Sequence, residues 1–225
     1  MSESVARTYR SIRRSMLSRH FVRKLTNRTD SLLRNRAIDA YNLVSIDPHC
    51  IEYIQTLPNG HPDEYLRGRL DKYQSYHLRG GDWDQHVFPI EETTFYQALY
   101  QRFTEGRKWE RTCLHPDRYD PDNPKPRHRY LELSKAEFQE NVEMIDRLYH
   151  SLKTDGYRPY YDRGDLYWDE PALNIGREGS VIRNSSGLHR IICAQLLNLS
   201  KISARILCVH SAYMESTDSL RMDPA

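Results

Sequence analysis

The amino-acid sequence predicts a mixed α+β fold, with a C-terminal core that follows a helical N-terminal elaboration. Residues 191–199 repeat apolar side chains with the period of a helix, and residues 200–210 alternate like a strand. A short strand pair precedes them, so the C-terminal order is strand, loop, helix, strand. A chain of 225 residues is long enough for one core, with or without an appended subdomain.

The first predicted helix upstream of this core spans residues 91–103. It has acidic residues at its start and Gly106 beyond its end, as helix termini favour. Its apolar side consists of Phe95, Leu99 and Phe103. Residues 115–128 then hold four prolines and many charges, which predicts a loop.

A second helix is predicted to begin after Ser134. Glu137 stands three residues later, so the pair matches a capping box. This helix is expected to run to about Lys153, because Gly156 follows closely enough to end it. We therefore divide the chain into a basic arm (1–36), a helical, loop-rich elaboration (37–135), the core (136–212) and a C-terminal tail (213–225).

Charge is concentrated in the N-terminal arm. Residues 1–36 contain ten basic residues and two acidic ones, a net charge of +8, so the rest of this +2 chain carries −6. Apolar residues recur among them at roughly helical spacing. Such a segment can lie on an anionic membrane surface, on a polyanion such as nucleic acid, or on the acidic body of its own protein. Its composition is also typical of a mitochondrial transit peptide.

Cysteine spacing and hydropathy exclude several classes of protein. The four cysteines show no Cys-x-x-Cys spacing, so neither a zinc site nor a disulfide framework is predicted. Cys193 and Cys208 lie in apolar runs and are predicted to be core residues. No run approaches the ~18 apolar residues of a membrane span. We expect a cytoplasmic protein, with peripheral attachment to the inner membrane face as an option for the arm.

The loop before the last helix contains the residues with the clearest chemical signal. Small residues let backbone N–H groups approach a ligand, and the first helical turn adds N–H donors and the positive end of the helix dipole. Arg190 adds a planar fork of donors that suits phosphate. An ordinary strand–loop–helix connection is the alternative. The predicted ligand-binding residues are Asn184, Ser185, Ser186, Gly187, His189 and Arg190.

The predicted catalytic residues are His189 and Arg190, together with the carboxylates of Asp82 and Glu178. Asp82 lies in the sequence Gly-Gly-Asp-Trp-Asp at 80–84. There it could hold Mg²⁺ together with phosphate oxygens or act as a general base, and a plain turn with a Trp anchor is the alternative. For Glu178 the alternative is a charged hairpin tip. No metal site built from protein ligands alone is predicted.

The motif Gly187-Leu188-His189-Arg190, followed by a helix and an Ile-x-Ala-Arg-Ile strand, resembles the ParB/sulfiredoxin superfamily, in particular its members with a Gly-x-His-Arg signature. Residues 149–157 resemble the opening helix and Gly-containing turn of that superfamily. The likeness covers roughly residues 140–210. The segments 80–84, 102–106 and 109–112 are similar to an uncharacterised microbial group of ParB-like proteins.

This resemblance implies several chemistries on one fold. Sulfiredoxins carry a catalytic Cys just before the His-Arg pair, where this chain has Leu188, which argues against sulfinic acid reduction. ParB proteins proper carry an Arg-rich box that binds a nucleoside triphosphate. The Gly-Leu-His-Arg motif is closer to the branch that contains small-molecule kinases. What the resemblance implies for this chain is a cradle for phosphate or nucleotide at residues 184–190.

The sequence therefore predicts a phosphate- or nucleotide-binding protein that acts as a nucleotide-dependent phosphotransferase or phosphohydrolase on a small molecule. ATP, ADP or CTP is the expected cofactor, with Mg²⁺ as an optional addition. Two alternatives stay open: a non-catalytic nucleotide-sensing module, and a ParB-like DNA-binding or nuclease protein. The acidic body and the absence of a helix–turn–helix pattern make DNA the less favoured partner.

Overall fold

A computed structural model describes residues 43–56, 77–118, 130, 133–159, 170–184 and 186–216 of the protein. The basic arm at 1–36 and most of the predicted proline-rich loop lie outside these residues. The partners expected for the arm therefore also concern residues that are not described. No helix in the described ranges combines the length and apolar character that crossing a bilayer requires.

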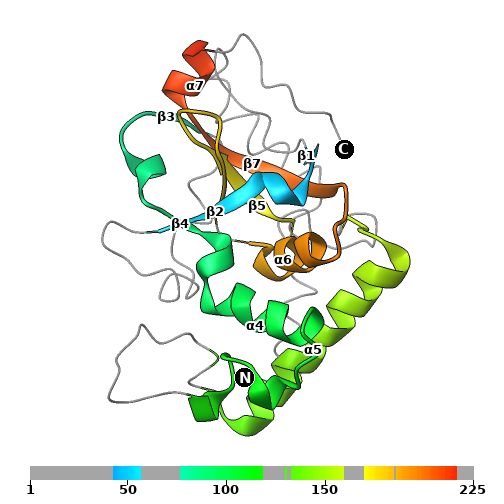
Figure 1. The fold of residues 1–225 in the computed structure, drawn as a ribbon. Coiled ribbons are helices and arrows are strands. Elements are labelled where there is room, and N and C mark those ends of the chain that lie inside the picture. Colours follow the sequence, from blue (N-terminus) through cyan, green and yellow to red (C-terminus); the bar gives the residue numbers. More distant parts are fainter. Residues whose placement is uncertain are drawn as a thin grey trace, which may run out of the picture.

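The described strands form one mixed sheet (Figure 1). Its order is β1-β7-β5-β6-β2-β4, and β3 pairs with β7 off this path. β7 is parallel to β3 and β5, and β6 is parallel to β2, whereas the β1–β7, β5–β6 and β2–β4 pairs are antiparallel. The strands are β1 (Leu43–Ile46), β2 (Ile51–Gln55), β3 (His77–Arg79), β4 (Val87–Pro89), β5 (Ala172–Ile175), β6 (Val181–Arg183) and β7 (Ile202–His210).

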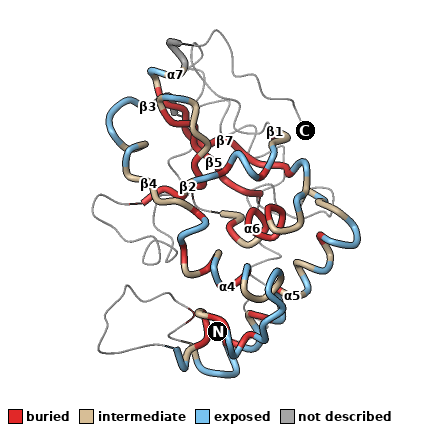
Figure 2. Tube along the Cα trace, in the orientation of Figure 1, coloured by how far each residue is buried: buried red, intermediate tan, exposed pale blue. Residues whose placement is uncertain are grey.

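Helices α4, α5 and α6 lie together on one side of the sheet (Figure 1). α6 is buried between the sheet and the other two helices, whereas the outer side of α5 is exposed (Figure 2). The described α-helices are α4 (Thr94–Phe103), α5 (Lys135–Asp155), α6 (Leu188–Leu196) and α7 (Ser211–Ser216). Short 3₁₀ turns are η2 (Pro48–Cys50), η3 (Trp83–Gln85), η4 (Ile90–Glu92), η5 (Trp109–Arg111) and η6 (Pro116–Arg118).

The first predicted helix starts later than the sequence indicated. Residues 90–92 form the 3₁₀ turn η4, and Thr93 is the N-cap of α4, with its side-chain oxygen accepting from Tyr96 N at 3.1 Å. A hydroxyl that satisfies a first-turn N–H fixes the helix start more firmly than acidic composition does. The predicted apolar side is confirmed, because Phe95 and Leu99 are buried and Phe103 is partly buried against the same core.

The second helix confirms its predicted cap. In α5, Ser134 Oγ accepts from Glu137 N at 3.3 Å, and Glu137 Oε2 accepts from Ser134 N at 3.0 Å. Gly156 ends the helix with φ of 72°, a conformation that glycine adopts without strain. The helix is two residues longer than predicted, ending at Asp155.

One hydrophobic core joins the two predicted parts of the chain. Ile54, Phe95 and Ile145 belong to the same buried cluster as Ile191 and Ile206. The mixed α+β class is confirmed. The stretch expected to be a helical, loop-rich elaboration contributes four strands to the sheet, so the boundary drawn at residues 135–136 does not separate two cores. Short strands with few apolar residues have weak periodicity, which is why they were not predicted.

Residues 80–86 connect β3 at one edge of the sheet to β4 at the other. On the way this segment contacts β7, the β5–β6 turn and β2. These contacts are a hydrogen bond from His210 Nε2 to Gly81 O, one from Arg177 to Asp84, and one from Gln55 to Trp83 O. The segment therefore crosses the sheet and brings the Gly-Gly-Asp-Trp-Asp sequence to the β5–β6 turn.

Candidate functional site

The predicted cradle runs from the end of β6 to the first turn of α6. The backbone N–H of Asn184 donates to Ala172 O at 2.7 Å, which extends the β5–β6 pairing to the loop. Gly187 is the N-cap of α6 and has φ of 82°, where side chains are strained. A Cβ atom on Gly187 would lie 2.6 Å from Pro171 Cα. Glycine is therefore required here by close packing on Pro171 as well as by backbone conformation.

Arg190 is anchored in that turn by a buried carboxylate that no sequence pattern indicated. Its Nη1 donates to Glu170 Oε2 at 3.1 Å and to the phenol oxygen of Tyr157 at 3.3 Å. The Glu170 side chain is 0% exposed and that of Arg190 is 10% exposed. Removing water from such a pair makes it strongly dependent on good hydrogen bonding. We call Tyr157, Glu170 and Arg190 the loop cluster.

Tyr157 completes the hydrogen bonding of this cluster. Its O–H donates to Glu170 Oε2 at 2.7 Å and also lies 3.0 Å from Ser203 O. Burial, which outweighs the opposing charge of Arg190, raises the pKa of Tyr157 well above its ordinary range. The phenol is therefore a neutral donor at physiological pH. Ser186 Oγ donates to the backbone oxygen of Glu170 at 2.6 Å, so the loop is also tied to this segment directly.

His189 is the partly exposed member of the His-Arg pair. Its ring stacks on Phe95 of α4, with ring centroids 4.7 Å apart, and its Nε2 lies 3.5 Å from the phenol oxygen of Tyr130. Phe95 and Tyr130 are both buried. The stack orients the imidazole while part of the ring stays accessible, which is a suitable arrangement for a ligand contact.

Three buried side-chain amides connect the start of the loop to the crossing segment. Asn184 Nδ2 donates to Asn174 Oδ1 at 3.3 Å, and Asn174 Nδ2 donates to Gln55 Oε1 at 3.3 Å. Gln55 Nε2 donates to the backbone oxygens of Trp83 at 2.5 Å and His86 at 3.2 Å. We call Asn184, Asn174 and Gln55 the amide chain. The polar loop start is thus hydrogen-bonded across three strands.

The β5–β6 turn holds a second arginine with two carboxylates. Arg177 Nε lies 2.9 Å from Asp84 Oδ2, and its Nη2 lies 2.7 Å from Asp84 Oδ1 and 2.8 Å from Asp82 Oδ1. The backbone N–H of Arg177 also donates to Asp84 Oδ2 at 2.8 Å. The side chain of Asp84 is 4% exposed, and that of Asp82 is 71% exposed. We call Asp82, Asp84 and Arg177 the tip cluster.

The tip cluster holds its carboxylates in the ionised form. Burial acts to raise the pKa of Asp84, but hydrogen bonds from Arg177 outweigh it, so the pKa lies below its ordinary value. The same hydrogen bonds raise the pKa of Arg177. A carboxylate whose oxygens already accept from a guanidinium is a weak base and a poor cation ligand. Glu178 follows Arg177 in the turn and is exposed.

His210 belongs to the same end of the sheet as the tip cluster. Its Nε2 donates to Gly81 O at 2.8 Å and lies 3.9 Å from Asp84 Oδ1. Its Nδ1 accepts from Ala212 N at 3.1 Å, at the start of α7. Since a carbonyl only accepts and an amide N–H only donates, these contacts define a neutral ring protonated at Nε2. His210 therefore links β7, α7 and the crossing segment.

The structure separates the predicted catalytic residues into two groups. His189 and Arg190 lie at the loop end of the β5–β6 hairpin, whereas Asp82 and Glu178 lie at its turn. β5 alone spans about 10 Å between these ends. The interpretation that all four residues act on one reacting group is therefore not supported by their placement. Ser185 lies outside the described residues.

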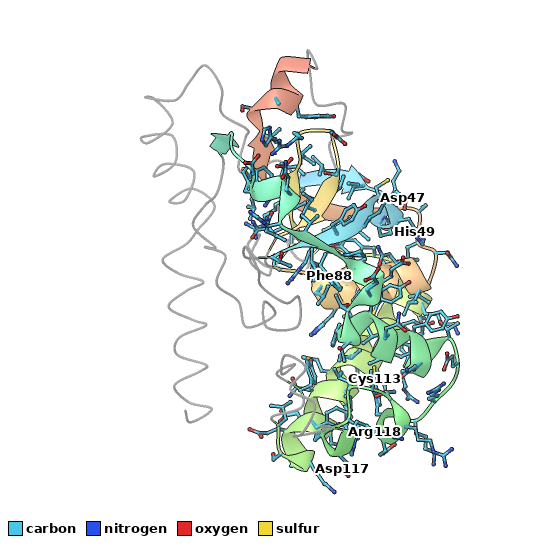
Figure 3. The ribbon with its side chains drawn as sticks, turned by 60° about the vertical axis from the view of Figure 1, so that its left-hand side comes forward. Asp47, His49, Phe88, Cys113, Asp117 and Arg118 are labelled. Atoms are coloured by element: carbon cyan, nitrogen blue, oxygen red, sulfur yellow. The ribbon has the colours of Figure 1, made fainter. Side chains whose placement is uncertain are left out.

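Other titratable pairs also stay local. Figure 3 shows Asp47 and His49 beside the sheet, and Asp117 and Arg118 beside the start of α5, toward the other end of the molecule. Asp47 Oδ1 accepts from His49 N at 2.9 Å, which is a capping contact of η2. Among the residues that the structure describes, no group of three or more His, Cys, Asp or Glu could hold a metal ion.

Glu170 and the amide chain are the site features that sequence reasoning missed. Glu170 stands in Asp-Glu-Pro, a composition typical of an exposed turn, and only its contact with Arg190 distinguishes it. Gln55 and Asn174 are single polar residues in strands and carry no spacing signal. Comparisons of the chain with protein-family models, with curated proteins and with solved structures found no match.

Proposed function

We propose that the chain binds a nucleotide or another phosphate-bearing small molecule at the loop formed by Asn184 and residues 186–190. One observation carries this proposal: Arg190 is anchored by Glu170 and Tyr157 in the first turn of a helix whose N-cap, Gly187, supplies no side-chain oxygen. A guanidinium in this turn adds positive charge where the helix dipole also favours an anion.

We also propose a ParB/sulfiredoxin-like core for residues 136–212. The order β6, loop, α6, β7 supports it, as does the position of Gly187, Leu188, His189 and Arg190 at the start of α6. The buried apolar run of α6 against β7 is the arrangement that the resemblance implies for this segment.

Ligand binding can be tested with the full-length protein and a panel of ATP, ADP, CTP and tripolyphosphate. A ligand at about 100 times its Kd stabilises the folded state by about 2.7 kcal/mol, which a thermal shift detects readily. We expect His189→Ala to weaken binding without unfolding the protein. His150→Ala is the matched control, since His150 is an exposed histidine on α5. No thermal shift with any of these compounds would refute the proposal.

Non-catalytic sensing is the form of this function that the carboxylates favour. Glu170 is the carboxylate at the loop, and Arg190 and Tyr157 both occupy its Oε2 atom. Asp82 and Glu178 lie at the other end of the hairpin. A general base must reach the proton that it abstracts, so none of these three is well placed for phosphoryl transfer.

Phosphotransferase or phosphohydrolase activity is the second candidate, and Mg²⁺ would be bound mainly through ligand phosphates. An assay for phosphate release or transfer with Mg²⁺ and each nucleotide separates it from sensing. Turnover that His189→Ala abolishes and His150→Ala retains would favour the enzyme. Nucleotide binding without turnover would favour the sensing module.

We propose a cytoplasmic location, with the basic arm as the segment that meets an anionic membrane surface or another polyanion. The net charge of +8 in residues 1–36 supports this proposal. Co-sedimentation with vesicles that contain anionic lipid, and salt-sensitive retention on DNA, would be compared for the full chain and a variant lacking residues 1–36. Equal behaviour of both proteins would exclude a role for the arm.

A further inference from the structure

The amide chain has a direction that its last acceptors impose. Gln55 meets the backbone oxygens of Trp83 and His86, and carbonyl oxygens only accept hydrogen bonds. Gln55 must therefore present its NH₂ group to them and its Oε1 atom to Asn174. Asn174 in turn must present its NH₂ group to Gln55 and its Oδ1 atom to Asn184.

The same logic reaches the loop. Asn184 must present its NH₂ group to Asn174, because Asn174 offers it only an oxygen. The amide is planar, so Asn184 Oδ1 lies on the side away from Asn174. All three residues are buried, with exposed fractions of 4–5%. Reversing one amide would set oxygen against oxygen in a buried site, which costs the full desolvation of the groups involved.

We propose that this one-way amide chain fixes Asn184 as a hydrogen-bond acceptor at the start of the candidate loop. Gln55 and Asn174 are positioning residues that act through Asn184. The ligand group that Asn184 meets is then a hydrogen-bond donor, such as a hydroxyl or an amino group, and not a phosphate oxygen. This inference rests on the proposed function for its ligand, and it assigns the non-phosphate part of that ligand to Asn184.

The direction of the chain can be tested without any ligand. In full-length protein labelled with ¹⁵N in Asn and Gln side chains, the NH₂ signals of Asn184 and Asn174 are expected to be well dispersed and slow to exchange with solvent. Gln55→Met removes the groups that orient Asn174, so we expect the Asn184 NH₂ signals to shift and exchange faster, although Asn184 does not bond to Gln55. Unchanged Asn184 signals would overturn the proposal.

Gln97→Met is the matched control for this experiment. Gln97 is exposed on α4, and its Nε2 also donates to a backbone oxygen, that of Glu91 at 2.6 Å. We expect this variant to leave the Asn184 signals unchanged. If it shifts them as much as Gln55→Met does, the effect is not specific to the amide chain and the proposal fails.

Calorimetry with ATP and with tripolyphosphate tests the ligand half. We expect Asn184→Ala to weaken ATP binding about tenfold, because a hydrogen bond from the nucleoside part is lost, and to leave tripolyphosphate binding within about twofold. Asn141→Ala, which removes an exposed asparagine on α5, should alter neither affinity. Equal weakening for both ligands would mean that Asn184 binds phosphate, which overturns the inference. If wild-type protein binds neither compound, the proposed function and the donor requirement fail together, and the amide signals still decide the orientation of Asn184.

Discussion

Arg190 and Arg177 make similar hydrogen bonds in opposite surroundings. Arg190 binds one carboxylate, Glu170, whose side chain is 0% exposed, and shares it with a buried phenol. Arg177 binds two carboxylates, of which Asp84 is buried and Asp82 is 71% exposed. Because charge interactions strengthen and desolvation costs rise as water is removed, the two arginines should differ greatly in what their loss costs. The loop cluster depends on every member, whereas water can replace part of the tip cluster.

The largest effect is expected for Arg190→Met. This change leaves the Glu170 carboxylate buried without its cation, and breaking a buried pair in this way costs about 3–5 kcal/mol. Urea unfolding of the purified variant measures the loss directly. The double variant Glu170→Gln/Arg190→Met removes both charges and should recover a large part of it. A loss below about 1 kcal/mol in the single variant would mean that water reaches Glu170 and that the two clusters are alike.

Glycine substitutions sharpen the same contrast between the two ends of the hairpin. Gly187 and Gly81 have φ of 82° and 90°, so alanine is strained at both. A Cβ atom would meet Pro171 at 2.6 Å in the first case and nothing within 4 Å in the second. We expect Gly187→Ala to cost at least about 2 kcal/mol and Gly81→Ala about 1 kcal/mol. Equal losses in urea unfolding would show that the loop moves away from Pro171 at little cost.

Asp84→Asn should cost about 1–2 kcal/mol at pH 7, since charge-assisted hydrogen bonds from Arg177 are weakened. The folded-state pKa of Asp84 lies below its ordinary value, so its contribution to stability is present above about pH 4 and is lost as the pH falls through the folded-state pKa. The gap in unfolding free energy between wild type and Asp84→Asn should therefore narrow from pH 7 to about pH 3. A gap that widens with acid would contradict this assignment.

Local signals in the sequence were sufficient for the helices but not for the sheet. Ser134 and Glu137 predicted the start of α5 because a capping box is made by residues close in sequence. Leu43–Ile46 and Ile51–Gln55 form strands only because β7 and β6 lie beside them. Such pairing depends on partners more than a hundred residues away, which no window of the sequence contains.

The candidate site divides in the same way. The glycine at position 187 and the helix that follows it were predictable, because both are features of a short segment. Glu170 was not, since an acidic residue in a turn is usually exposed, and its burial results from contacts with Tyr157 and Arg190 on two other segments. The separation of Asp82 from Arg190 likewise follows from the path of residues 80–86 across the sheet. Sequence motifs identified where polar chemistry lies, but tertiary contacts decide which of those residues meet.

Asp82→Asn is expected to have the smallest effect, within about 0.5 kcal/mol, because an exposed carboxylate gains little from an ion pair that water also satisfies. Its contribution should disappear in 1 M NaCl, where charges are screened within about 3 Å. The loss for Asp84→Asn should persist in the same salt, because its partner bonds are shielded from solvent. A salt-resistant loss of 2 kcal/mol or more, roughly that of a buried pair, in Asp82→Asn would place Asp82 in a buried network as well. That outcome would remove the difference between the two clusters and make the β5–β6 turn as rigid a candidate site as the loop.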